Sequence, residues 1–152
     1  MPINPEDIEF EDAAVRYLNL EGREGMYNAA GDRGFTLLVP ANRVDELLAK
    51  GWNVGFMKQR PDDDTPPQAK LDISVSVKSF PSKVYMISDG NSTLLDENTM
   101  GMIDAMEIES IDLVIRGYAW EVNGNSGIKA YLKNGYFNVA VDRFAQKWGI
   151  YK

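Results

Sequence analysis

The sequence contains neither cysteine nor histidine. Their absence excludes disulfides, thiol nucleophiles and imidazole bases, and it removes the side chains that hold most zinc ions. The three consecutive aspartates at 62–64 lack the glycine and the terminal glutamate of an EF-hand calcium loop. The glycine-rich stretch 22–34 lacks the G-x-x-x-x-G-K-[ST] pattern that binds nucleoside triphosphates. We therefore expect no metal and no cofactor, and we expect that the protein is not an enzyme.

The sequence also lacks long hydrophobic runs. No segment approaches the roughly 20 apolar residues that cross a bilayer as a helix. The first residues, MPINPEDIEFED, show neither the basic nor the apolar region of a signal peptide. We expect a cytoplasmic protein without membrane contact. Its 152 residues, 44% of them hydrophobic, suffice for a single domain over residues 1–152, with flexible loops near 21–34 and 60–69.

Acidic residues outnumber basic ones, 23 to 16, and the net charge is −7. This balance argues against a nucleic-acid partner for the chain as a whole. Most of the acids, however, lie in residues 6–12, 62–64 and 89–112, whereas residues 113–152 hold six bases and two acids. Because exposed charges are screened beyond roughly 8 Å at physiological salt, the C-terminal part permits a bound polyanion.

Residues 112–142 contain two long runs of strand-forming residues around Asn123-Gly124-Asn125-Ser126-Gly127, a turn-rich sequence that predicts a hairpin. Successive side chains point to opposite faces of a strand. In each strand one face is aliphatic or small, whereas the other mixes bases with aromatic rings. The mixed residues are Arg116, Tyr118, Trp120, Lys129, Tyr131 and Lys133.

The pairing register decides whether these six residues share a face, because opposed residues of two strands lie on the same side. Pairing of Trp120 with Lys129 or Tyr131 collects all six, whereas pairing with Ala130 leaves both faces mixed. We expect the first register, since a one-residue slip turns a strand's whole pattern to the wrong side. Such a face suits single-stranded nucleic acid, whose bases stack on rings while cations follow the phosphates. The alternative is that the aromatic rings belong to the core and that the Lys and Arg side chains form a solvated rim around it.

The rest of the chain predicts a mainly β fold. Strand patterns at short spacing give about seven strands, with one helix near 42–50 and a second near 95–107, and the tail 142–152 is expected to form one or two helical turns. The first helix has Asn42 as its expected N-cap and Gly51 just past its end. A helix before the final strand pair is a feature of the oligonucleotide-binding (OB) fold. We expect an antiparallel OB-fold-like barrel of five to seven strands with one or two short helices.

Four segments within residues 10–145 carry a resemblance to a known family. They are GREGMYNAAGDRGF (22–35), VDELLAKGWNVGFMK (44–58), KVYMIS (83–88) with the downstream LLDENTMGMID (94–104), and DLVIRGYAWEVNGNSGIKAYLK (112–133). In these segments the sequence resembles single-stranded DNA-binding proteins encoded by tailed bacteriophages, which are built on the OB barrel.

The resemblance implies binding of single-stranded DNA (ssDNA) without sequence preference, which would protect ssDNA during phage replication or recombination in the host cytoplasm. The implied partners are ssDNA and phage replication or recombination proteins, and an edge strand leaves a homodimer open. By position, the implied nucleic-acid-binding residues are Arg23, Tyr27 and Arg33 in the first loop, and Arg116, Tyr118, Trp120, Lys129 and Tyr131 in the hairpin.

Two other functions remain open at the level of sequence. A phage structural or adaptor protein can use the same face for protein contact, because Tyr, Trp and Arg are common interface anchors. A small hydrolase can be built from acids alone, and Glu107 and Glu109 form one such pair. Neighbouring acids on a surface are more often simply solvated, and the sequence holds no cofactor motif to favour catalysis.

Overall fold

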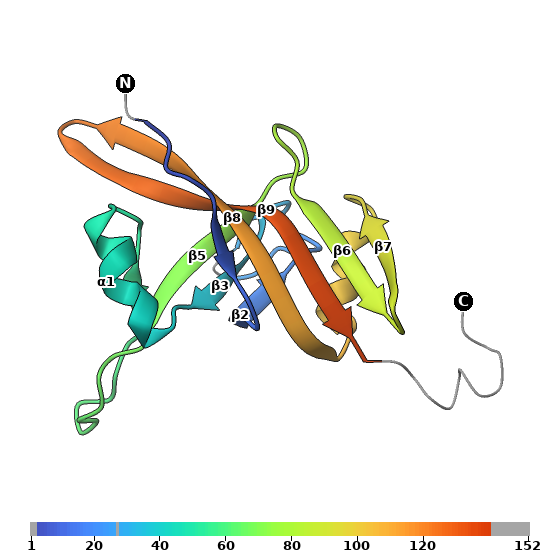
Figure 1. The fold of residues 1–152 in the computed structure, drawn as a ribbon, viewed down its shortest axis with the longest axis horizontal. Helices are drawn as coiled ribbons and strands as arrows, with labels where there is room; N and C mark the ends of the chain where they lie inside the picture. The colour runs from blue at the N-terminus through green and yellow to red at the C-terminus, as the bar shows by residue number, and fades with distance from the viewer. Residues whose placement is uncertain (1–2, 27, 141–152) are drawn as a thin grey trace.

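The computed structural model describes residues 3–26 and 28–140. Within these residues nine strands form one mixed sheet with the order β1-β8-β9-β5-β3-β2, while β4 pairs with β5, and β6 pairs with both β9 and β7 (Figure 1). The strands are β1 (Ile8–Phe10), β2 (Ala14–Asn19), β3 (Arg33–Leu38), β4 (Gly55–Phe56), β5 (Ala69–Val75), β6 (Lys83–Ser88), β7 (Asn91–Leu95), β8 (Ile108–Val122) and β9 (Asn125–Val139).

The expected hairpin is present and is longer than the sequence pattern suggested. Strands β8 and β9 have 15 residues each and cross the whole molecule in Figure 1. Asn123 and Gly124 join them with φ values of 51° and 82°, as a two-residue turn with two left-handed positions requires. The expected five-residue loop is therefore a tight turn, and Asn125, Ser126 and Gly127 already belong to β9.

The expected antiparallel barrel of five to seven strands is wrong in strand number and in pairing. Strand β9 is long enough to take two further neighbours on its free edge, β5 near Ala130 and β6 near Asn134, and both pair with it in parallel. The strand order ends at β1 and β2, which do not pair with each other in the described part of the chain, so the sheet is not closed into a barrel. The mainly β class with short helices is confirmed.

A bulge in β9 sets which side chains form the core. On β8 the odd-numbered residues 111–117 are buried throughout. Opposite them, β9 buries Ala130 and Leu132 before the bulge and Gly135 and Phe137 after it, because Lys133 has no partner between the pairs Ile115↔Leu132 and Val114↔Asn134. Both halves of β9 thus contribute to one core, in which Phe137 also meets Phe35 edge-on at 6.4 Å.

The first helix, α1 (Ala41–Ala49), lies beside the hairpin in Figure 1. Its N-cap is Pro40, which makes no side-chain cap hydrogen bond, so the expected cap at Asn42 is wrong. Gly51 follows the helix with a φ of 90°, as expected for a residue just past a helix end.

The second expected helix is reduced to a 3-10 helix, η1 (Met100–Ala105). Asp96 closes the turn before it, because its Oδ1 accepts hydrogen bonds from Thr99 Oγ1 at 3.0 Å and from the N–H groups of Asn98 and Thr99 at 2.9 and 3.0 Å. The Thr99 side chain and then the Asn98 amide lower the pKa of Asp96. The expected helical turns at 142–152 lie outside the described residues. No helix in residues 3–26 and 28–140 is long and apolar enough to cross a membrane.

Candidate nucleic-acid interface

The register of β8 and β9 places the predicted aromatic and basic residues on one face. Arg116 pairs with Tyr131, Tyr118 with Lys129, and Trp120 with Gly127. The expected common face is confirmed for five of the six residues. The expected pairing of Trp120 with Lys129 or Tyr131 is wrong, because Trp120 lies opposite Gly127. We call Arg116, Tyr118, Trp120, Lys129 and Tyr131 the hairpin face.

The rings of the hairpin face lie outside the core. Tyr118 is 56% exposed, and Trp120 and Tyr131 are half-buried. The intervening Gly117 is buried against Trp52 and Ile128 on the opposite side of the hairpin. The core alternative for these rings is therefore wrong, because the alternation along the strands separates them from the interior.

The cations of the hairpin face are held close to rings and carry no carboxylate partner among the described residues. Lys129 Nζ lies 5.1 Å from the centroid of the Tyr131 ring, within the range of a cation–π contact. The Arg116 guanidinium lies 5.3 Å from the centroid of Phe80. Both cations can therefore still meet a phosphate, Arg116 through the guanidinium N–H groups that do not bind the Phe80 carbonyl.

Trp120 rests on the strand opposite it. A Cβ on Gly127 would lie 2.9 Å from Trp120 Cζ2 and 2.3 Å from Asn53 Oδ1. A glycine is thus needed at this position so that the indole can lie across β9 and cover the backbone. Trp120 has a packing role on its inner side, and its half-exposed outer side belongs to the hairpin face.

Sequence reasoning missed Phe80. This residue lies in the connection between β5 and β6, is 78% exposed, and borders a groove of about 410 Å³ beside the hairpin face. Arg116 Nη2 donates a hydrogen bond to the Phe80 carbonyl at 3.1 Å, which holds the connection against β8. The signal in the sequence was an aromatic residue in the short serine- and proline-containing connection after the alternating strand. The groove is lined by Asn4, Ser76, Ser79, Phe80, Arg116, Gly117, Tyr118 and Tyr131.

Lys133 differs from the residues of the hairpin face because it has no partner on β8. It occupies the bulge of β9, and its Nζ lies 2.6 Å from Asp7 Oδ2. The N-terminal segment that carries Asp7 follows the outer edge of β8, where Asn4 Oδ1 accepts a hydrogen bond from the Ala119 N–H at 2.9 Å. Lys133 is thus engaged by an acidic segment of the same chain.

The first loop is connected to the hairpin face by a row of paired residues. Loop 21–34 is anchored at Asn19, whose Oδ1 accepts hydrogen bonds from the N–H groups of Gly22 and Arg23, both at 3.0 Å. The row crosses β8, β9, β5, β3 and β2 through Arg116, Tyr131, Ser74, Gly34 and Asn19. Along it, Asn19 lies three strand spacings of about 4.8 Å from Tyr131, or roughly 14 Å.

The three predicted residues of this loop differ in their surroundings. Arg23 is exposed and lies 3.6 Å from Glu21 and 3.7 Å from Asp104. Arg33 is half-buried, and its Nη1 donates to the carbonyls of Leu20 and Glu97 at 3.2 and 2.8 Å, so it holds the loop against the segment before η1. Tyr27 lies outside the described residues.

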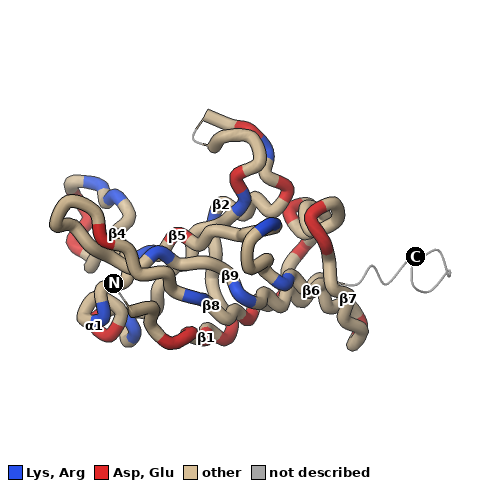
Figure 2. Tube along the Cα trace, turned by 90° about the horizontal axis from the view of Figure 1, so that it is seen from above, with Lys and Arg blue, Asp and Glu red and all other residues tan. Residues whose placement is uncertain are grey.

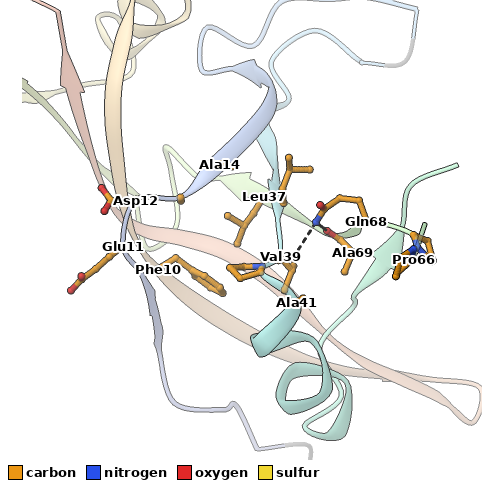
Figure 3. Close-up of a pocket in the computed structure, with 14 residues that line it drawn as sticks. Phe10, Glu11, Asp12, Ala14, Leu37, Val39, Ala41, Pro66, Gln68 and Ala69 are labelled. Atoms are coloured by element: carbon orange, nitrogen blue, oxygen red, sulfur yellow. Dashed lines mark hydrogen bonds between the residues drawn. The ribbon is translucent and has the colours of Figure 1, made fainter. Parts of the chain in front are cut away.

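A second cavity lies away from the hairpin face. It has a volume of about 380 Å³ and is bordered by Phe10, Val39 and Gln68 among other residues (Figure 3). Gln68 Nε2 donates a hydrogen bond to the Val39 carbonyl at 3.1 Å. The charged residues of its lining are Glu11 and Asp12, which disfavours a polyanion there. Figure 2 shows the same separation of charge, with basic segments on β8 and β9 and acidic segments along β1.

The family model described as "Putative phage ssDNA-binding domain" matches residues 2–150. Among solved structures, the chain is similar to the C-terminally truncated single-stranded DNA-binding protein from bacteriophage Enc34, with 15% identity and a TM-score of 0.51 over 90% of this chain and 87% of that one. It is also similar to the Enc34 protein in complex with ssDNA, with 16% identity and a TM-score of 0.50 over 90% and 88% of the two chains.

At these identities the structural likeness shows a shared fold. No curated protein sequence matches the chain. The family match covers nearly the whole sequence and agrees with the resemblance carried by the loop, helix and hairpin segments. The chain belongs to the family of phage ssDNA-binding domains.

Proposed function

We propose that this protein binds ssDNA without sequence preference and that the hairpin face is the center of the binding surface. The observation that carries the proposal is the joint position of Tyr118 and Tyr131, outside the core, beside Lys129 and Arg116. Bases can stack on the rings, at about 1–3 kcal/mol per base, while the two cations neutralise phosphates. Family membership and the solved complex of the Enc34 protein with ssDNA support the choice of ligand.

The row of paired residues from Arg116 to Asn19 suggests the path of the bound ssDNA. A strand that crosses the sheet along this row would pass from the hairpin face to Arg23, which is exposed at the start of the first loop. Arg33 would act by positioning that loop, because two backbone carbonyls already occupy its guanidinium. Lys133 would join the surface after its separation from Asp7.

The protein's acidic net charge is compatible with this function because the field at the site is local. A net charge of −7 slows the approach of a polyanion, but screening beyond roughly 8 Å leaves the local cations to decide binding. In this proposal the protein protects ssDNA intermediates of phage replication or recombination, a task that needs no catalytic group.

Titration of fluorescently labelled oligo-dT at two salt concentrations tests the proposal. We expect binding that weakens with salt, at a log–log slope of roughly −0.7 per phosphate neutralised. Absence of binding at micromolar protein in low salt would refute it. Co-purification of another phage protein that survives nuclease treatment, together with no binding to oligo-dT, would instead support the adaptor function.

A further inference from the structure

We propose that the groove between Phe80, Tyr118 and Tyr131 takes a single unstacked nucleobase, and that Asn4 and Ser79 hydrogen-bond its edge. This inference rests on the proposed function and adds to it a discrete base-binding recess with a preference among bases. The groove has a volume of about 410 Å³, which lies at the lower end of the range for small-molecule sites.

Phe80 is the residue that points to a ligand. The residue is 78% exposed, so burial in the core does not account for a phenylalanine at this position. Its backbone has a φ of 47°, in the left-handed region that glycine and asparagine adopt more easily. Within the described residues the Arg116 guanidinium, 5.3 Å from the ring centroid, is a cation–π partner of Phe80, and it leaves most of the residue exposed. An exposed ring held by an unusual backbone conformation is typical of a residue that contacts a ligand, because strained residues gather at binding sites.

The connection that carries Phe80 is held in place before any ligand arrives. Arg116 binds the Phe80 carbonyl at 3.1 Å. Ser82 N–H donates to the Ser76 carbonyl at 2.8 Å, and Ser76 Oγ donates to the Ser79 carbonyl at 2.7 Å. Ser82 Oγ in turn donates to the Leu132 carbonyl of β9. A wall fixed in this way loses little conformational freedom when a base enters.

The polar groups of the recess are mainly donors. Because a backbone N–H can only donate, the bond from the Ala119 N–H fixes Asn4 Oδ1 toward β8 and leaves the Asn4 amide N–H groups without a partner among the described residues. The Ser79 hydroxyl is likewise without a partner there. Donors match the carbonyl oxygens of thymine and guanine, whereas adenine offers only ring nitrogens as acceptors and presents an amino group that itself needs an acceptor. We therefore expect the recess to prefer a carbonyl-bearing base over adenine.

Phe80→Ala is the first test, with Phe56→Ala as its matched control. Phe56 is 48% exposed in β4 and does not line the groove. We expect Phe80→Ala to weaken oligo-dT binding about 5- to 150-fold, the equivalent of about 1–3 kcal/mol for one stacked base. The salt slope should stay unchanged because no charge is removed, and Phe56→Ala should bind like the wild type. Equal affinities of both variants and the wild type would refute the binding of a base in the groove, while the proposed ssDNA-binding function would stand.

Two further measurements separate a recess from a flat stacking surface. In the first, an abasic nucleotide replaces each thymidine in turn in the shortest oligo-dT that binds with full affinity. We expect the wild type to lose most affinity when one particular position is abasic. Phe80→Ala should lose no affinity at that position. Asn4→Asp keeps the acceptor for the Ala119 N–H but removes the amide donors. We expect it to bring the ratio of oligo-dT to oligo-dA affinity closer to one. An equal loss of affinity at all abasic positions, or an unchanged ratio of oligo-dT to oligo-dA affinity in Asn4→Asp, would contradict the binding of a single base in the groove. Failure of the wild type to bind any oligonucleotide would instead reject the proposed function.

Discussion

Lys133 Nζ lies 2.6 Å from Asp7 Oδ2, so an acidic side chain of the N-terminal segment forms a salt bridge with a cation next to the hairpin face. Both side chains are partly exposed, at 49% and 33%. An ion pair of this kind adds only about 0–1 kcal/mol to stability. Its larger consequence is competition, because a phosphate that approaches Lys133 has to replace the Asp7 carboxylate.

Removal of the competing charge is expected to strengthen ssDNA binding. Asp7→Asn should lower the Kd for oligo-dT by up to about fivefold, the equivalent of about 1 kcal/mol. It should also steepen the salt dependence by up to about 0.7 in log–log slope, because Lys133 then releases a counterion when it meets phosphate. Fluorescence anisotropy at several salt concentrations measures both quantities. Asp64→Asn, which removes the same charge from the exposed residues 60–68, is the control, and an equal gain in that variant would contradict a role for Asp7.

Loss of rings from the hairpin face is expected to weaken binding without unfolding the protein. The double variant Tyr118→Ala with Trp120→Ala removes up to two stacking partners, each worth about 1–3 kcal/mol. Oligo-dT titration measures the loss, and circular dichroism checks the fold. Tyr17→Ala, at a residue that is 73% exposed in β2, is the matched control. If the double variant binds oligo-dT with the same affinity as Tyr17→Ala, the hairpin face is not the binding surface.

A side chain at position 117 is expected to destabilise the hairpin. A Cβ on Gly117 would lie 2.5 Å from Pro5, 2.7 Å from Trp52 and 2.8 Å from Ile128, and these atoms are packed on the inner side. Gly117→Ala should therefore cost about 1–3 kcal/mol in the free energy of unfolding, as overpacking typically does. Urea denaturation measures this loss. Gly25→Ala, whose Cβ would meet nothing within 4 Å, should show little change, and equal stabilities of the two variants would contradict the packing.

The Asp96 turn is expected to add a pH-dependent contribution to stability. Hydrogen bonds from Thr99 and Asn98 hold the pKa of Asp96 below its ordinary value of 3.8 in the folded protein. The contribution is therefore complete above the unfolded-state pKa and is lost as the pH falls through the lower, folded-state pKa. Asp96→Asn should lower the free energy of unfolding at pH 7, and its difference from the wild type should shrink at acidic pH.

Urea denaturation between pH 7 and pH 2 follows the Asp96 effect, because the expected loss lies below the ordinary pKa of 3.8. Asp45→Asn, an exposed acid of α1, controls for the general loss of one negative charge. A difference between wild type and Asp96→Asn that stays constant over this range would show that the carboxylate charge does not stabilise the turn.

The sequence determined the features that depend on neighbours along the chain. Alternation alone put Tyr118 and Trp120 on the face opposite Gly117, and the Asn123-Gly124 turn joined the two strands in a register that brought Lys129 and Tyr131 to the same face. These features could be predicted because strand periodicity and turn geometry are local properties.

Tertiary structure decided the features that depend on distant partners. The parallel pairing of β9 with β5 and β6, the bulge at Lys133, the contact of Arg33 with the Glu97 carbonyl and the place of Phe80 beside Arg116 all join residues far apart in the chain. No periodicity or motif encodes such pairings, because they arise when the whole sheet buries one common core. The hairpin face was therefore visible in the sequence, whereas the recess beside it emerged only from the packing of a distant connection.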